Sequence, residues 1–187
     1  MKKSDEVLVE ETRRGNKKSF ELLVIKYEKH IFNIIFRFTK DQEIVAELSQ
    51  ETFFKAYRAI HDFKGRSSFY TWLRQIAINN SINYLHSRKD VSSLDTDNVE
   101  AQVQEPRDNN NVRANPEKQL LSQEDITAVR NALDSIPERF RSILIMREFE
   151  EMSYEEIAGV LECPVGTVRS RLFHARRVLK EELDSYW

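Results

Sequence analysis

Apolar residues recur at intervals of three and four along most of this chain, and this period restricts the fold to one built mainly from α-helices. The clearest run follows Asn16 and contains Phe20, Leu23, Val24, Tyr27, Ile31, Ile34, Ile35 and Phe38. Such spacing lines one face of a helix, whereas a strand needs strict alternation. Other faces of the same segment are also apolar, at Leu22, Ile25, Phe32 and Phe36. We therefore expect this helix to be central to a bundle.

The remaining helices follow from the same period and from residues that start or stop helices. The 187 residues include only four glycines and four prolines, and 40% are hydrophobic and 32% charged, which is typical of a soluble all-α protein. Pro137 separates two helices, while Ser122 with Asp125 and Ser153 with Glu156 have the spacing of capping boxes. The pattern predicts helices over 5–14, 41–62, 68–87, 122–135, 138–149 and 154–161, and a last one after the turn that contains Gly166.

The character of the sequence changes between residues 90 and 116, where the period is lost and Asp, Asn and Ser are frequent. Such a segment is typical of a linker. We expect two small helical domains, over 1–90 and 120–187, joined by a flexible acidic linker over 91–119. The acidic residues of this linker could keep it extended and away from DNA. The alternative is that the linker is simply a solvated tether.

Charge is strongly segregated along the chain, although the net charge is only −2. Residues 52–89 carry seven basic residues and one acid, whereas 90–125 carry three basic residues and nine acids. The stretch from Arg169 to Lys180 contains no acid at all. Two basic regions are therefore available for phosphates, although charge runs are also common on solvated faces.

Residues 152–183 have the parts of a helix-turn-helix: a short capped helix, a turn with Pro164 and Gly166, and a longer amphipathic helix. The second helix has an apolar stripe at Val168, Leu172, Ala175 and Leu179. This stripe leaves another face outward, with Arg169, Ser170, Phe173, His174 and Arg177. Arginine and serine can bond base edges, and an aromatic edge can contact the thymine methyl group. We interpret this face as DNA-binding; an ordinary helical hairpin with a solvated basic face is the alternative.

The predicted helix over 41–62 has an outer stripe of charged and amide residues that includes one large aromatic side chain, at Glu47, Gln50, Glu51, Phe54, Lys55 and Arg58. An exposed Phe54 among charges favours a protein partner. The same residue could equally belong to a broad buried face.

Basic and aromatic residues alternate between the third and fourth predicted helices. The segment runs through Phe63, Lys64, Gly65, Arg66, Ser67 and Ser68 into Phe69, Tyr70 and Trp72, with Asn79, Asn80 and Asn83 following. Aromatic rings stack on unpaired bases and side-chain amides pair with base edges, so this composition suits single-stranded nucleic acid. For Phe69 and Leu73 we favour a place in the core; for Lys64, Arg66 and Asn79 we favour function.

Four short motifs stand out in the two predicted domains: Glu-Leu-Ser-Gln-Glu-Thr-Phe (47–53), Ala-Tyr-Arg (56–58), Phe-Tyr-Thr-Trp-Leu (69–73) and Cys-Pro-Val-Gly-Thr-Val-Arg-Ser-Arg (163–171). In these motifs the chain resembles the extracytoplasmic-function (ECF) sigma factors, nearest to the sigma-E type. These motifs correspond to sigma regions two and four, and the likeness covers nearly the whole chain except the linker.

The resemblance implies roles for both domains. Region two would bind the clamp of bacterial core RNA polymerase and melt the minus-ten promoter element, and region four would bind the polymerase flap and read the minus-35 element. The clamp contacts would be Glu47, Gln50, Glu51 and Phe54. Minus-ten contacts would be Lys64, Gly65, Arg66, Ser67, Ser68, Tyr70, Trp72 and Asn79. Minus-35 contacts would be Arg169, Ser170, Arg171, Phe173, His174 and Arg177. A membrane-anchored anti-sigma factor is a further implied partner.

Two residues depart from the family pattern. Glu47 stands where the family usually has Asp, which lengthens the side chain and keeps its charge. His174 stands where the nearest relatives have Arg, so the upstream consensus is expected to differ. A free-standing helix-turn-helix regulator, expected to be a dimer on a palindrome, is the alternative function.

Other classes of function find little support. No apolar run approaches the roughly 18 residues of a membrane helix, the residues from Asp5 to Glu11 do not suit a secretory leader, and the single Cys163 cannot form an internal disulfide. We expect a cytoplasmic protein. No group of His, Cys or carboxylates has the spacing of a metal site or a catalytic constellation, so we expect no cofactor, no metal and no enzymatic activity.

Overall fold

The computed structural model describes residues 3–92 and 123–184, and side-chain contacts are described for 3–88 and 127–184. These residues form helices and no strand, which confirms the all-α prediction. The chain divides into two compact units, Met1–Ser93 and Leu94–Trp187. Most of the predicted linker, and Ser122 of one predicted capping box, lie outside the described residues. No helix in the described ranges is long and apolar enough to cross a membrane.

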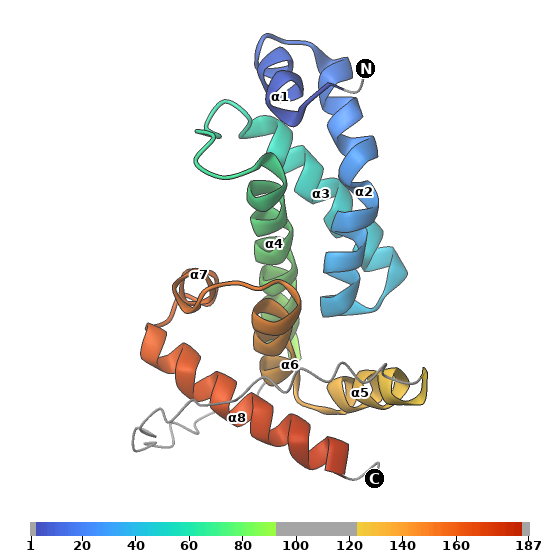
Figure 1. Cartoon of the computed structure of the whole chain (residues 1–187), viewed down its shortest axis with the longest axis vertical. Helices are drawn as coiled ribbons and strands as arrows, with labels where there is room; N and C mark the ends of the chain where they lie inside the picture. The colour runs from blue at the N-terminus through green and yellow to red at the C-terminus, as the bar shows by residue number, and fades with distance from the viewer. Residues whose placement is uncertain (1–2, 93–122, 185–187) are drawn as a thin grey trace, which may run out of the picture. The chain divides into compact units, whose positions relative to one another are not determined.

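The first unit contains α1 (Asp5–Arg13), α2 (Lys17–Thr39), α3 (Gln42–Arg58) and α4 (Phe69–Ser92). Helices α2, α3 and α4 pack against one another, and α1 packs on α2 (Figure 1). Seven of the eight residues of the predicted α2 stripe are buried and Val24 is half-buried. The second apolar face of α2 is not buried, since Ile25 is 67% exposed. Helix α2 is therefore central to the unit on one side only.

Polar side chains fix where these helices begin. The Asn16 side chain accepts from Lys18 N at the start of α2, and Asp41 accepts from Glu43 N and Ile44 N at the start of α3. Both satisfy amide groups that a helix leaves free at its first turn. The predicted end of α3 at residue 62 is wrong, because the helix stops at Arg58 and residues 59–62 form turns. Helix α4 continues to Ser92, five residues beyond the predicted end, since no glycine or proline stops it.

The second unit contains α5 (Gln123–Ser135), α6 (Glu138–Leu144), a π-helix η1 (Ile145–Phe149), α7 (Tyr154–Val160) and α8 (Val165–Asp184). Helices α5, α6 and α7 all pack on α8. The predicted capping box before α7 is confirmed: Ser153 accepts from Glu156 N, and the Glu156 carboxylate accepts from Ser153 N.

An uninterrupted α-helix over 138–149 was expected, and this expectation is wrong. The α-helix ends at Leu144 and the chain continues in the wider π form through Phe149. This turn buries Ile145 and Met146 and lets Glu150 N donate to Ile145 O. The sequence pattern alone does not account for this winding, because Ile143 and Leu144 are equally buried in the preceding α-helix; π turns are frequent near functional sites.

Candidate nucleic-acid interface

Helix α8 has one buried face and one exposed face, as its sequence predicts. Val168, Leu172 and Ala175 are buried against the other helices of the unit, and Leu179 is half-buried. The residues predicted to bind DNA lie away from this buried face: Arg169, Arg171, Phe173 and Arg177 are exposed, and Ser170 and His174 are half-buried. The exposed face thus combines guanidinium groups, a hydroxyl and an aromatic edge on one helix.

Several side chains on the exposed face of α8 make contacts within the helix. Ser170 Oγ donates to Thr167 O at 3.1 Å, so the hydroxyl already has one partner. The Phe173 and His174 rings meet edge to face with centroids 5.7 Å apart. Arg177 lies near Glu181 on the next turn at 3.7 Å, an exposed pair that contributes little energy.

The turn before α8 differs from the predicted one. Gly166 lies within the first turn of α8 and does not supply positive φ; the residue with positive φ is Glu162, at 49°. Pro164 O accepts from Thr167 N and Val168 N, which starts the helix. Cys163, in this turn, is half-buried.

Arg176 is a residue of α8 that sequence reasoning did not single out. Its guanidinium donates two hydrogen bonds to Glu148 Oε1 of the π-helix, at 2.8 and 3.2 Å. This hydrogen bonding raises the pKa of Arg176 above its ordinary value. The pair links α8 to the π-helix, a contact between residues 28 positions apart that no local pattern predicts.

The outer face of α3 is exposed as predicted. Glu47 and Gln50 are exposed, and Glu51 is half-buried with an ion pair to Lys55 at 2.7 Å. Phe54 is 60% exposed, so its place in the core, left open by the sequence, is excluded. The Arg58 guanidinium lies 5.6 Å from the Phe54 ring centroid. An exposed aromatic ring bordered by charges is typical of a protein contact.

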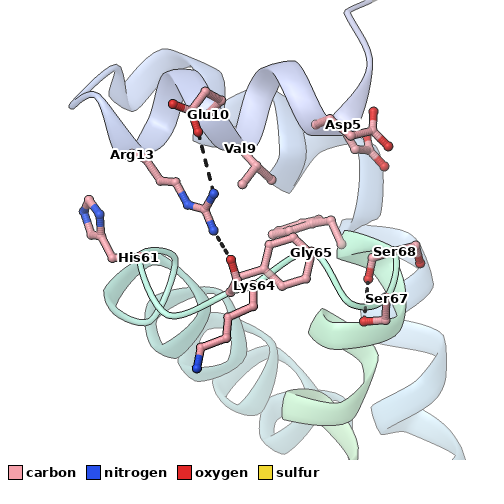
Figure 2. A pocket seen from close by; sticks show the side chains of 12 residues that line it. Asp5, Val9, Glu10, Arg13, His61, Lys64, Gly65, Ser67 and Ser68 are labelled. Atoms are coloured by element: carbon pink, nitrogen blue, oxygen red, sulfur yellow. Dashed lines mark hydrogen bonds and ion pairs between the residues drawn. The ribbon is translucent and has the colours of Figure 1, made fainter.

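The five loop residues that were predicted to contact the minus-ten element are all exposed: Lys64, Gly65, Arg66, Ser67 and Ser68. Gly65 has φ +67°, a conformation that side chains with a Cβ rarely adopt. Ser68 Oγ accepts from Thr71 N at 3.0 Å and so caps the first turn of α4. The loop and α1 line a pocket of about 720 Å³, shown in Figure 2.

The aromatic residues at the start of α4 are partly core. Phe69 and Leu73 are buried, as favoured from the sequence, whereas Tyr70 and Trp72 are half-buried. Trp72 packs 5.0 Å from Phe63, and Tyr70 stacks 5.5 Å from Tyr27. Burial, followed by the hydrogen bond to Asp5, raises the pKa of Tyr27. Tyr70 and Trp72 can therefore present only part of each ring to a ligand.

The three asparagines of α4 have different surroundings. Asn79 and Asn83 are exposed, and Asn79 Oδ1 accepts from Gln75 Nε2 at 3.3 Å. Asn80 is buried: its amide donates to Thr52 Oγ1 at 3.0 Å and accepts from Lys55 Nζ at 2.6 Å. The expectation that Asn80 serves unpaired bases is therefore wrong, because packing of α4 on α3 covers its side chain.

No group of three or more histidine, cysteine or acidic side chains suited to a metal ion is present in the described parts of the chain. The side chains that remain available form three surfaces: the outer face of α8, the loop 64–68 with the start of α4, and the outer face of α3. Each supports binding through hydrogen bonds, charge and stacking.

Two family models match the chain, Sigma-70 region 2 over residues 23–91 and Sigma-70, region 4 over residues 126–179. The RNA polymerase sigma-H factor of Pseudomonas aeruginosa is 42% identical over 186 residues, covering 96% of this chain and 94% of that protein. The ECF RNA polymerase sigma-E factor of Escherichia coli strain K12 is 41% identical over 183 residues, covering 97% and 95%. The chain belongs to the ECF sigma factors.

Solved structures agree on the fold. The sigma factor RpoE of Bartonella quintana, solved with the anti-sigma factor NepR, matches with a TM-score of 0.59 and 23% identity, covering 89% of this chain and 98% of that one. CnrH, solved with the cytosolic domain of CnrY, matches with a TM-score of 0.58 and 22% identity, covering 97% of each chain.

This sigma factor directs core RNA polymerase to specific promoters and so initiates transcription. The free-standing regulator weighed above is not favoured, because region 2 matches as well as region 4. A regulator that binds an operator alone would need only the second.

Proposed function

We propose that this sigma factor contacts promoter DNA and polymerase through the three exposed surfaces described above. The minus-35 element would be bound by Arg169, Ser170, Arg171, Phe173, His174 and Arg177. The minus-ten element would be bound by Lys64, Gly65, Arg66, Ser67, Ser68, Tyr70, Trp72 and Asn79. The polymerase clamp would be bound by Glu47, Gln50, Glu51 and Phe54. The observation that supports this proposal most is the exposure of the whole 64–68 loop beside the aromatic start of α4.

At the minus-35 element, α8 would lie in the major groove with its exposed face toward base edges. An arginine that bridges two acceptors of guanine is worth about 1–3 kcal/mol of discrimination. Arg169 is the favoured residue for this contact, because it is exposed and lies in the first turns of the helix. His174 is half-buried and packs edge to face on Phe173, so it reaches less far than an arginine would.

At the minus-ten element, the loop would bind a base flipped out of the duplex. Unpairing and unstacking cost a few kcal/mol per base, and stacking returns about 1–3 kcal/mol. Hydrogen bonds from the loop and from Asn79 would supply the rest. The protein can thus shift a melting equilibrium by binding alone, and we assign it no catalytic chemistry and no cofactor.

At the polymerase, the outer face of α3 would bind the clamp. Phe54 would fill an apolar site on the partner, and the flanking carboxylates of Glu47 and Glu51 would pair with basic residues. Buried aromatic residues with a charged border commonly dominate protein interfaces.

An anti-sigma factor is the regulator that we propose for this chain. CnrH and RpoE were solved with the cytosolic domain of CnrY and with the anti-sigma factor NepR. By analogy, an anti-sigma factor would cover the polymerase-binding surfaces of this chain. We infer action in the cytoplasm on a stress-response set of promoters, with 1–90 and 120–187 as the working domains and 91–119 as the tether.

A transcription assay tests the central proposal. The full chain is mixed with bacterial core RNA polymerase and a library of random promoter sequences, and run-off products are sequenced. We expect promoter-dependent products only when both proteins are present, and little binding of duplex by the chain alone. Absence of any promoter-dependent product would exclude it.

A further inference from the structure

Helix α1 is bound to the rest of its unit by polar contacts on both sides. The carboxylate of Asp5 accepts from Lys26 and from the Tyr27 hydroxyl, and Glu11 accepts from Ser19. These contacts fix α1 against α2. Helix α1 nevertheless lies before the stretch that the Sigma-70 region 2 model matches, which begins at residue 23.

One residue of α1 crosses to the chain that enters the minus-ten loop. Arg13 Nε donates to Ile60 O at 3.1 Å, and Arg13 Nη2 donates to Phe63 O. The guanidinium carbon also lies 6.0 Å from the Phe63 ring centroid. Figure 2 shows Arg13 extending from α1 toward the loop, with Glu10 beside it at 3.6 Å. Arginine suits this place because its planar group can donate to two carbonyls at once.

At the start of the exposed loop, Arg13 supplies the side-chain hydrogen bonds that the structure describes. Among the described residues, Lys64, Gly65 and Arg66 make no hydrogen bond or ion pair with the rest of the unit. At the far end, Ser68 bonds Thr71 and caps α4. At the near end, Phe63 is held by Arg13 and by packing on Trp72 and Phe69. Residues 64–67, all exposed, therefore lie between two anchored ends, and Arg13 supplies the hydrogen bonds at the first.

We propose that Arg13 is a positioning residue for promoter melting: it fixes the start of the 64–68 loop so that the loop is ready to take a flipped base. This inference rests on the proposed function of the loop. A loop that is ordered before binding loses less conformational entropy when it captures its ligand. Arg13 itself need not touch DNA, because its guanidinium is committed to Ile60 O and Phe63 O.

The test uses holoenzyme formed from the full chain and core polymerase, on a promoter recovered from the random library. Closed-complex affinity is measured on duplex DNA, and the rate of opening is followed with 2-aminopurine in the minus-ten element. Variants are Arg13→Ala, Arg13→Lys and the matched control Arg14→Ala. Arg14 is the neighbouring arginine of the same charge, and its side chain pairs only with Glu10, at 3.1 Å, among the described contacts. Lys64→Ala tests the proposed function of the loop.

We expect Arg13→Ala to slow opening about tenfold, the size expected for loss of charged hydrogen bonds. Closed-complex affinity should stay within about twofold, as should both quantities for Arg14→Ala. Arg13→Lys should keep the chain folded but not restore opening, since an ammonium cannot bridge both carbonyls in the same way. If circular dichroism shows that Arg13→Ala is unfolded, the opening rate of Arg13→Lys alone tests the role of Arg13.

The role of Arg13 is overturned if the folded variant, Arg13→Ala or otherwise Arg13→Lys, opens the promoter at the normal rate. It is also overturned if that variant loses closed binding and opening equally. Unchanged opening in Lys64→Ala overturns the proposed function of the loop, and the inference about Arg13 falls with it. Slow opening in both Lys64→Ala and the Arg13 variant supports both statements.

Discussion

Asn79 and Asn80 are adjacent in α4, and their side chains have opposite surroundings. One is exposed, while the other is buried between α3 and α4, where it donates to the buried Thr52 and accepts from the exposed Lys55. Asn80→Ala removes the donor that bonds the buried Thr52 hydroxyl, which costs about 1–3 kcal/mol of stability. Asn79→Ala should leave stability unchanged and weaken opening of the promoter more than closed binding. Urea unfolding followed by circular dichroism, and opening kinetics, separate the two.

The reverse pattern would contradict the division between these residues: a stability loss in Asn79→Ala, or none in Asn80→Ala. An equal loss of closed and open complexes in Asn79→Ala would also remove it from the minus-ten contacts. Because the same substitution is made at adjacent positions of one helix, each variant serves as the control for the other in expression, helix propensity and chain position.

Arg169 is predicted to set base preference at one upstream position. Arg169→Ala should relax the preference there at a cost of about 1–3 kcal/mol for the preferred base, leaving other positions unchanged. Selection from the promoter library with each holoenzyme measures this. Lys180→Ala is the control, because Lys180 is exposed on the same helix but outside the predicted contacts. An unchanged base preference in Arg169→Ala would exclude direct contact.

At the scale of elements, attachment of α1 to α2 should depend on pH through Glu11. Hydrogen bonds from Lys3 and then Ser19 lower the pKa of Glu11 in the folded chain. A folded pKa below the unfolded one means that ionised Glu11 stabilises the fold at neutral pH and that this contribution is lost as pH falls below about 5. Urea unfolding of wild type and Glu11→Gln should show a stability difference that shrinks from pH 7 to pH 4.

The exposed Glu28→Gln serves as the control for this titration, with a difference from wild type that we expect to be small at every pH. A gap between wild type and Glu11→Gln that stays constant over the same range would show that Glu11 does not act through its charge.

The short helix α7 should depend on its capping box. Ser153→Ala removes the bond that Ser153 Oγ accepts from Glu156 N, and loss of such a cap typically costs about 1 kcal/mol. Ser153→Asp keeps an acceptor and should retain most of the stability. Thermal unfolding of the three proteins measures the difference; equal stability of Ser153→Ala and wild type would mean that packing alone holds α7.

The elements themselves were largely predictable from sequence because local rules determine them. The stripes of α2 and α8 follow from period alone, and Ser153 with Glu156 marks the start of α7. Contacts that join distant residues were not predictable: the Arg13 bonds to Ile60 and Phe63 span about fifty positions. The π-helix and the burial of Asn80 also depend on packing partners that a single sequence does not reveal.

At the scale of the whole molecule, the two units should contribute independently to promoter use. Lys64 and Arg169 belong to different compact units. Effects at sites that share no partners usually add in free energy within about 0.5 kcal/mol. The double variant Lys64→Ala with Arg169→Ala should therefore lose promoter association by close to the product of the two single losses. Association rates of the three holoenzymes check this, and a double variant no worse than one single variant would contradict independence.

Helix α1 has a practical consequence for exchanging promoter preference between related sigma factors. If only residues 64–68 were replaced by those of a related sigma factor, the new loop would still be held at its start by Arg13 of the recipient. If the donor protein has another residue in place of Arg13, its loop would not be held by the same hydrogen bonds to the carbonyls at positions 60 and 63. The grafted loop would then be poorly ordered. Recipient and donor should therefore be matched at α1 before any change of specificity is judged, and the first thirteen residues should be exchanged together with the loop.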